Sequence, residues 1–210
     1  LQVGQPKVLE REIEGVRSEP VEELTIELPQ EISGRAIEMV TSRKGTLLNI
    51  ESRGERQQLL FEIPSRGLIG LRSNVLTATQ GEAVISHRFK EYQPFKGEIE
   101  GRGNGSLFSV ETGVAIAYSI DRVQDRGHFF VEPGEEIYVG QIVGKNNRDE
   151  DLGVNICRGK RHTNIRAAGS DDKIILTPPI KFTLEEALEY IEGDELVEVT
   201  PNYIRLRMAP

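Results

Sequence analysis

The chain has 210 residues, a formal net charge of −8 at pH 7 and a pI of about 5.1. With 37% hydrophobic and 29% charged residues, it has the composition of a soluble globular protein. Its acidity excludes a general nucleic-acid coat, because most of the surface would repel phosphate. The lone Cys157 cannot form an internal disulfide, and no apolar run approaches the roughly 20 residues that span a bilayer. We therefore expect a cytoplasmic protein with no membrane partner.

Residues 1–17 are predicted to be the last strand of a preceding domain, followed by a polar connector. The segment starts at Leu1 rather than at a methionine. Val3 and Val8 flank Pro6, which has no N–H to donate to a sheet and therefore confines this strand to an edge. We expect the chain to be part of a longer protein.

Residues 18–94 show the periodicities of a β-α-β-β-α-β order. Alternating apolar residues predict strands near 24–28, 46–50, 59–63 and 83–89, and helical spacing predicts helices from Ser33 and from Pro64-Ser65. Leu48 and Ile50 fall on one side of the second strand, and His87 and Phe89 on one face of the fourth. Two successive βαβ halves predict an α+β domain, the ferredoxin-like split β-α-β sandwich, with both helices on one face of a four-stranded antiparallel sheet.

Residues 95–210 are predicted to form a mostly β domain with one strong helix. Short candidate strands separated by glycines lie at 108–110, 115–120, 128–131, 137–143, 152–156 and 174–177. The helix spans 183–192, where Thr183 and Glu186 have the spacing of a capping box. A closing hairpin is expected around Pro201-Asn202.

A basic segment interrupts this β domain. From Arg158 to Arg166 the chain carries four Lys or Arg residues and one His, and no Asp or Glu. By contrast, residues 183–198 carry seven Asp or Glu residues and no Lys or Arg. Guanidinium, ammonium, imidazole, hydroxyl and amide donors suit phosphate oxygens and exposed base edges. The predicted RNA contacts are Arg158, Lys160, Arg161, His162, Thr163, Asn164 and Arg166. The alternative interpretation of this segment is a solvated basic turn.

Secondary RNA-binding candidates lie in the ferredoxin-like domain. They are Arg43, Lys44 and Arg53 at turns, and Arg66 and Arg72 beside Gly67 and Gly70. Each glycine within a helix costs roughly 1 kcal/mol relative to alanine. These two glycines therefore indicate that the helix backbone lies close to a neighbouring surface. The helix approaches either the sheet beneath it, which we favour, or an RNA or protein partner.

The remaining sequence offers no catalytic constellation. No G-x-x-x-x-G-K-[ST] phosphate loop is present, and the three His and single Cys lack zinc-ligand spacing. The glycines of residues 101–105 are better explained by a flexible turn than by a phosphate loop. Cys157 is better explained as a buried, inert thiol than as a nucleophile. We expect no catalytic residue, no metal and no cofactor in these 210 residues.

Several stretches together resemble the BipA/TypA family of translational GTPases. Pro64-Ser-Arg-Gly-Leu-Ile-Gly-Leu-Arg72, set in the β-α-β-β-α-β frame, resembles the family's fifth domain, which is similar to domain five of elongation factor G. Residues 3–8 resemble the end of its third domain. Residues 95–210 resemble its own C-terminal domain, with matching stretches at Gln124-Asp-Arg-Gly127, 159–166 and 194–201.

This resemblance implies a ribosome-associated GTPase that acts in large-subunit assembly and stress adaptation. The basic segment is implied to reach the A-site region of the large-subunit rRNA, with tRNA in the A or P site as a further partner, and the fragment is implied to be monomeric. GTP and Mg²⁺ are implied for a domain before Leu1, so the fragment itself would not be an enzyme. An alternative from another class is a protein-docking module, in which the acidic helix 183–192 binds a ribosomal protein or factor.

Overall fold

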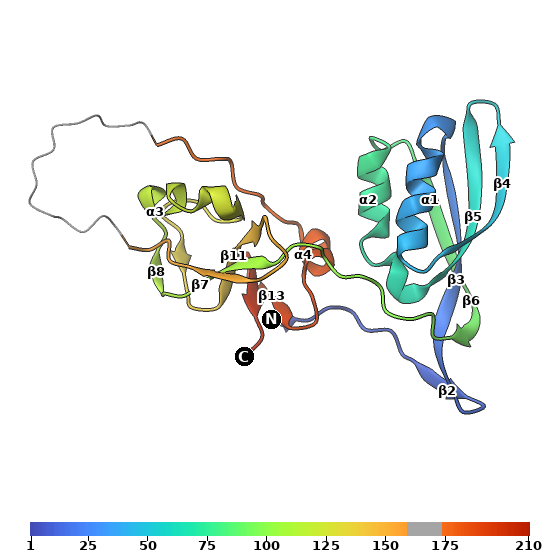
Figure 1. Cartoon of the computed structure of the whole chain (residues 1–210), viewed down its shortest axis with the longest axis horizontal. Helices are drawn as coiled ribbons and strands as arrows, with labels where there is room; N and C mark the ends of the chain where they lie inside the picture. Colours follow the sequence, from blue (N-terminus) through green and yellow to red (C-terminus); the bar gives the residue numbers. More distant parts are fainter. Residues whose placement is uncertain (159–173) are drawn as a thin grey trace, which may run out of the picture. The chain divides into compact units, whose positions relative to one another are not determined.

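The computed structural model describes residues 1–158 and 174–210 and forms two compact units. One unit comprises Pro6–Gly101, and the other comprises Leu1–Gln5 together with Arg102–Pro210 (Figure 1). No helix in the described ranges is both long and apolar enough to cross a membrane.

Residues 1–17 are divided between the two units, although the sequence suggested a segment outside both domains. Strand β1 (Gln2–Val3) pairs antiparallel with β13 (Glu195–Val199) of the second unit. Strand β2 (Arg11–Ile13) pairs with β3 (Val16–Pro29) of the first. Backbone pairing decides the assignment, because each strand joins the sheet that satisfies its N–H and C=O groups. The second unit also begins at Arg102 rather than at residue 95.

The unit Pro6–Gly101 has the predicted ferredoxin-like fold. After β3 come η1 (Gln30–Ile32), α1 (Ser33–Ser42), β4 (Thr46–Arg53), β5 (Arg56–Pro64), η2 (Ser65–Leu68), α2 (Leu71–Ala78) and β6 (Val84–Pro94). The four long strands form an antiparallel sheet in the order β4-β5-β3-β6, and both helices lie on one side of it (Figure 1). The core between sheet and helices includes Leu24, Ile26, Val40 and Phe61, each of which is fully buried.

The second helix of this unit is interrupted, which the sequence did not predict. Residues 65–68 form a 3-10 turn, Gly70 adopts a left-handed conformation with φ of 77°, and α2 begins only at Leu71. A Cβ on Gly67 would lie 2.7 Å from the carbonyl oxygen of Arg43 and 3.0 Å from the side chain of Ile63. Close packing within the domain therefore accounts for Gly67, and backbone conformation accounts for Gly70.

Two sheet edges depart from the predicted alternation of apolar residues. A bulge between Leu47 and Asn49 turns Leu47 toward the core and leaves Leu48 and Ile50 exposed on the edge strand β4. Phe89 on the opposite edge strand, β6, is 58% exposed beside a second irregularity in register. An extra residue in one strand breaks the two-residue period, so the pattern alone could not place these side chains.

The second unit is built on a mixed sheet whose main path is β1-β13-β14-β11-β7-β12, with β9 also paired to β11. Strands β8 and β10 form a separate pair. The remaining elements are β7 (Ser106–Ser109), β8 (Gly113–Val114), α3 (Ala117–Asp121), η3 (Gln124–Arg126), β9 (Gly127–Phe129), β10 (Glu136–Ile137), β11 (Gln141–Asn146), β12 (Leu152–Val154), α4 (Leu184–Tyr190) and β14 (Ile204–Met208).

The β-rich character, the capped helix and the closing hairpin of this unit were predicted correctly. Glu186 N–H donates to Thr183 Oγ1 (3.3 Å) and Thr183 N–H to Glu186 Oε2 (2.8 Å), which completes the capping box. Two predicted strands were wrong: the short helix α3 replaces most of 115–120, and 174–177 is not a strand. A short apolar run does not by itself distinguish a strand from a buried turn of helix.

Candidate nucleic-acid interface

The predicted basic segment is only partly within the described residues. Arg158 is described, whereas Lys160, Arg161, His162, Thr163, Asn164 and Arg166 lie outside the described residues. The structure therefore shows how the two described chain ends that border residues 159–173 are held, at Arg158 and at Ile174–Thr177.

The first end is fixed through the backbone of Arg158. Its carbonyl oxygen accepts a hydrogen bond from the Ser119 hydroxyl of α3, and its N–H donates to Asn155 Oδ1 (3.2 Å). The guanidinium forms an ion pair with Glu111 at 3.1 Å, but the side chain remains 74% exposed. Because exposed ion pairs contribute only about 0–1 kcal/mol, a phosphate could compete with Glu111 for this guanidinium.

The second end is held by the side-chain amide of Gln124 in η3. Its Nε2 donates to the carbonyl oxygen of Ile175 (3.1 Å), and its Oε1 accepts from the N–H of Thr177 (3.3 Å). Nε2 also donates to Asp121 Oδ1 (2.7 Å), which orients the amide. Residues 117–126 thus hold the described chain on both sides of residues 159–173.

The stretch Gln124–Gly127, noted in the sequence only as a resemblance, therefore has a structural role. A Cβ on Gly127 would lie 1.9 Å from the carbonyl oxygen of Lys145, so β9 can approach β11 this closely only with glycine. The motif combines an anchor for residues 175–177 with a close strand contact. A polar residue followed within three positions by glycine was the only signal in the sequence.

Two of the secondary candidates are engaged inside the ferredoxin-like unit. Arg43 donates from Nη1 to the carbonyl oxygens of Gly67 (3.2 Å) and Ile69, so it supports η2. Arg66 pairs with Glu19, whose side chain is fully buried, and also donates to the carbonyl oxygen of Gly97. Removing a guanidinium from such a buried pair costs several kcal/mol, so Arg66 has a structural role.

The other three secondary candidates lie at the surface. Lys44 and Arg72 are exposed, and Arg53 makes an exposed ion pair with Glu51 at 3.3 Å. Lys44, two residues after the end of α1, has a left-handed backbone with φ of 65°. The surface cations that remain available to a phosphate in this unit therefore include Lys44, Arg53 and Arg72.

Several acids of residues 183–198 have partners within their own unit. Glu186 closes the capping box, Glu192 accepts the N–H of Arg102 (2.6 Å), and Glu198 accepts the hydroxyl of Tyr138 (2.5 Å). Glu195 is 1% exposed and pairs with Arg102. Many of these acidic side chains therefore stabilise the fold of their own unit, although the sequence suggested an exposed acidic surface.

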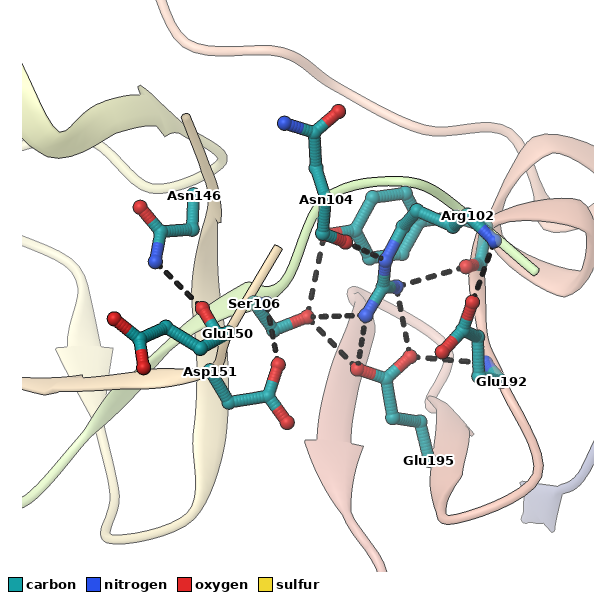
Figure 2. Close-up of polar contacts among 9 residues, drawn as sticks. Arg102, Asn104, Ser106, Asn146, Glu150, Asp151, Glu192 and Glu195 are labelled. Carbon is teal, nitrogen blue, oxygen red and sulfur yellow. Dashed lines mark hydrogen bonds and ion pairs between the residues drawn. The ribbon is translucent and has the colours of Figure 1, made fainter. Parts of the chain in front are cut away.

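The side chain of Arg102 is extensively hydrogen-bonded, although the sequence suggested a flexible turn at residues 101–105. Its Nη1 and Nη2 donate to the two carboxylate oxygens of Glu195 at 2.9 and 2.8 Å, and Nε donates to the carbonyl oxygen of Asn104 at 2.6 Å (Figure 2). Nη1 also donates to the carbonyl oxygen of Tyr190, and Nη2 to the hydroxyl of Ser106. All five N–H donors are thus used.

The electrostatics of this cluster keep the guanidinium charged. Burial alone would lower the pKa of Arg102, but the hydrogen bonds to Glu195 and the negative charges nearby raise it above its ordinary value. The guanidinium also lies 4.2 Å from the ring centre of Tyr190. In the described part of the chain, no group of three or more His, Cys, Asp or Glu side chains is arranged to hold a metal ion.

We expect the stability of the second unit to fall above pH 10 because of Tyr138. Burial and the hydrogen bond to Glu198 raise the pKa of the Tyr138 hydroxyl above its ordinary value of about 10. The unfolded chain then loses this proton at a lower pH than the folded unit does. The stabilising contribution is therefore complete below pH 10 and decreases as the pH rises toward the folded pKa.

The measurement is the free energy of unfolding at pH 9 and pH 11 for the natural sequence and for Tyr138→Phe. The natural sequence should lose more stability over this interval than Tyr138→Phe does. Equal losses would show that Tyr138 does not carry the effect.

A ferredoxin-like unit followed by a β-rich unit is the domain order expected for the C-terminal part of an elongation-factor-G-like protein. The family model for the elongation factor G C-terminus matches residues 16–102, and the model for the TypA/BipA C-terminal domain matches residues 104–210. The second model covers half of the chain. The chain belongs to the TypA/BipA family.

Curated relatives agree with this assignment. Proteins named large ribosomal subunit assembly factor BipA from Bacillus subtilis and Salmonella typhimurium are each 46% identical over 209 residues, which is 99% of this chain. The protein of the same name from Synechocystis is 44% identical over 207 residues, or 98% of the chain. The chain spans about a third of the length of these relatives, 34% of the first two and 35% of the third.

Proposed function

We propose that this chain is the non-catalytic, ribosome-docking part of a large-subunit assembly factor and that its basic segment contacts large-subunit rRNA. The supporting observation is that Ser119 and Gln124 hold the described residues on either side of 159–173, at Arg158 and at Ile175, in a family with members named large ribosomal subunit assembly factors. Because these flanking residues are already anchored, binding would cost less conformational entropy than it would for an unanchored loop.

The charge distribution suits local docking rather than general coating. The net charge of −8 repels phosphate from most of the surface, while the segment from Arg158 to Arg166 attracts it. Arg and Lys supply charge-assisted hydrogen bonds to phosphate, and His162, Thr163 and Asn164 supply donors for sugar hydroxyls and base edges. The partner in this proposal is the A-site region of large-subunit rRNA, or tRNA in the A or P site.

The proposal extends to the whole protein. The relatives are about three times as long as this chain, and the sequence contains no phosphate loop. GTP hydrolysis with Mg²⁺ would therefore take place in a domain that precedes Leu1, and the whole protein would act in the cytoplasm in subunit assembly and stress adaptation. The fragment would dock as a monomer.

The test measures the affinity of this chain for large ribosomal subunits at several salt concentrations. If about four phosphates are neutralised, log affinity should fall with log salt at a slope near −3, because each contact contributes roughly −0.7 to −0.9. Lys160→Ala with Arg161→Ala should weaken binding and make the slope shallower by about 1.5. Arg35→Ala with Arg148→Ala removes the same charge from exposed positions outside the predicted interface and is the control.

Gln124→Ala separates anchoring from charge in the same assay. It removes the hydrogen bonds to Ile175 and Thr177 but keeps every cation. Affinity should fall about fivefold, which corresponds to about 1 kcal/mol, while the slope should stay unchanged. An unchanged slope in the Lys160/Arg161 double variant would remove the basic segment from the proposal.

The protein-docking alternative has less support, because Glu186, Glu192, Glu195 and Glu198 are engaged within their own unit. The exposed Glu185 lies outside these contacts. Loss of ribosome binding in Glu185→Lys would favour protein docking, whereas unchanged or tighter binding would favour RNA.

A further inference from the structure

We infer that the chain bends between its two units only at residues 98–101 and 4–8, because strand pairing or arginine–glutamate contacts anchor the chain on each side of these stretches. The inference concerns the two connections that join the units (Figure 1). It does not rest on the proposed function.

Residues 95–97 are anchored to the ferredoxin-like unit. Phe95 N–H donates to the carbonyl oxygen of Arg17 (3.0 Å), and Lys96 N–H donates to Glu19 Oε1 (2.9 Å). Arg66 bridges the buried carboxylate of Glu19 and the carbonyl oxygen of Gly97. The Phe95 ring contacts two guanidinium groups, with centroid distances of 3.9 Å to Arg17 and 4.5 Å to Arg66.

Arg102 anchors the other end of this connection to the second unit. Its backbone N–H donates to Glu192 (2.6 Å), and its guanidinium is held by Glu195, so both main chain and side chain are fixed (Figure 2). Between the two anchors, residues 98–101 make no hydrogen bond or ion pair with the described residues, and Glu98, Glu100 and Gly101 are exposed. This four-residue stretch reaches at most about 14 Å when extended.

The second connection has the same arrangement. On one side, β1 is paired with β13. On the other, the carbonyl oxygen of Leu9 accepts the hydroxyl of Tyr92 (3.4 Å), and Glu10 pairs with Arg17 at 2.6 Å. Residues 4–8 lie between these anchors and make no hydrogen bond or ion pair with any residue that the structure describes.

Two short connections restrict the motion of one unit relative to the other more than a single connection would. A single tether allows free rotation about its own direction, whereas two tethers allow bending mainly about the line that joins them. A few loop residues that absorb backbone rotation between fixed anchors are the usual form of a hinge. Arg17 contacts both connections, through Glu10 and through Phe95, so the two hinge stretches start from one place on the ferredoxin-like unit.

The experiment measures the distance between spin labels at Ser42→Cys and Asn202→Cys, one in each unit, in the full chain with Cys157→Ser as background. Releasing the first anchor with Glu19→Met and Arg66→Met should widen the distance distribution by about a fifth, because the free stretch lengthens from four residues to about six and its span grows with the square root of its length. Glu51→Gln with Arg53→Met removes an exposed ion pair of the same unit and should leave the width unchanged.

Amide exchange supplies a second readout. The Lys96 amide should exchange about tenfold faster in the released variant, while the Leu60 amide in the middle of β5 should not change. If the double variant does not fold, Phe95→Leu takes its place, because it removes both guanidinium–ring contacts without leaving a buried charge. A label distribution and a Lys96 exchange rate equal to those of the natural sequence would overturn the inference.

Discussion

Replacing Arg102 with methionine is expected to lower the free energy of unfolding of the second unit by about 3–5 kcal/mol. The variant leaves the carboxylate of Glu195 1% exposed and without its guanidinium partner. It also removes the donors to the carbonyl oxygens of Asn104 and Tyr190. An uncompensated buried charge is among the most destabilising changes a single substitution can make.

Urea unfolding followed by tyrosine fluorescence measures this effect, because four of the five tyrosines (118, 138, 190 and 203) belong to this unit. The control Arg53→Met removes an arginine whose side chain is 65% exposed, and it should cost less than about 1 kcal/mol. The double variant Arg102→Met with Glu195→Met should be more stable than Arg102→Met alone, since no buried charge remains. A double variant that is less stable than the single one would contradict this account.

Gly105→Ala is expected to destabilise the same unit by about 3 kcal/mol or more, because the backbone leaves no room for a methyl group. A Cβ there would lie 2.1 Å from the carbonyl oxygen of Glu150. The glycine cannot shift, since its N–H donates to the carbonyl oxygen of Arg148 and its own carbonyl oxygen accepts from Asn146, both at 2.8 Å.

Gly103→Ala is the matched control two residues away. A Cβ on Gly103 meets nothing within 4 Å, so this substitution should change stability by less than about 0.5 kcal/mol. Thermal unfolding of the two variants provides the comparison. Similar melting temperatures for both would show that the contact with Glu150 is relieved by movement of the backbone.

Both predictions concern the neighbourhood of Arg102, which is also the anchor of one hinge stretch. A substitution that loosens this cluster should therefore affect stability and the range of inter-unit distances together. Substitutions in the basic segment, such as Lys160→Ala, should affect neither. The effects of docking residues and scaffold residues can thus be separated by experiment.

Most local structure could be predicted from the sequence, because local periodicity and capping depend on neighbouring residues. The alternation of Leu24, Ile26 and Leu28 predicted β3, and the spacing of Thr183 and Glu186 predicted the start of α4. The β-α-β-β-α-β order follows from such signals, and it leads to the ferredoxin-like fold. Local signals failed where a bulge shifted the period, as at Leu48, or where a short apolar run was ambiguous, as at 115–120.

The sequence by itself thus determined the order of elements in the first unit, the β-rich nature of the second and the location of the basic segment. Only the tertiary structure decided which charges hold the fold. Arg66 and Glu19 are 47 residues apart and Arg102 and Glu195 are 93 apart, so nothing local marks them as pairs. Burial decides their role, because a charge removed from water must be paired, whereas the same residue at the surface is available to a partner.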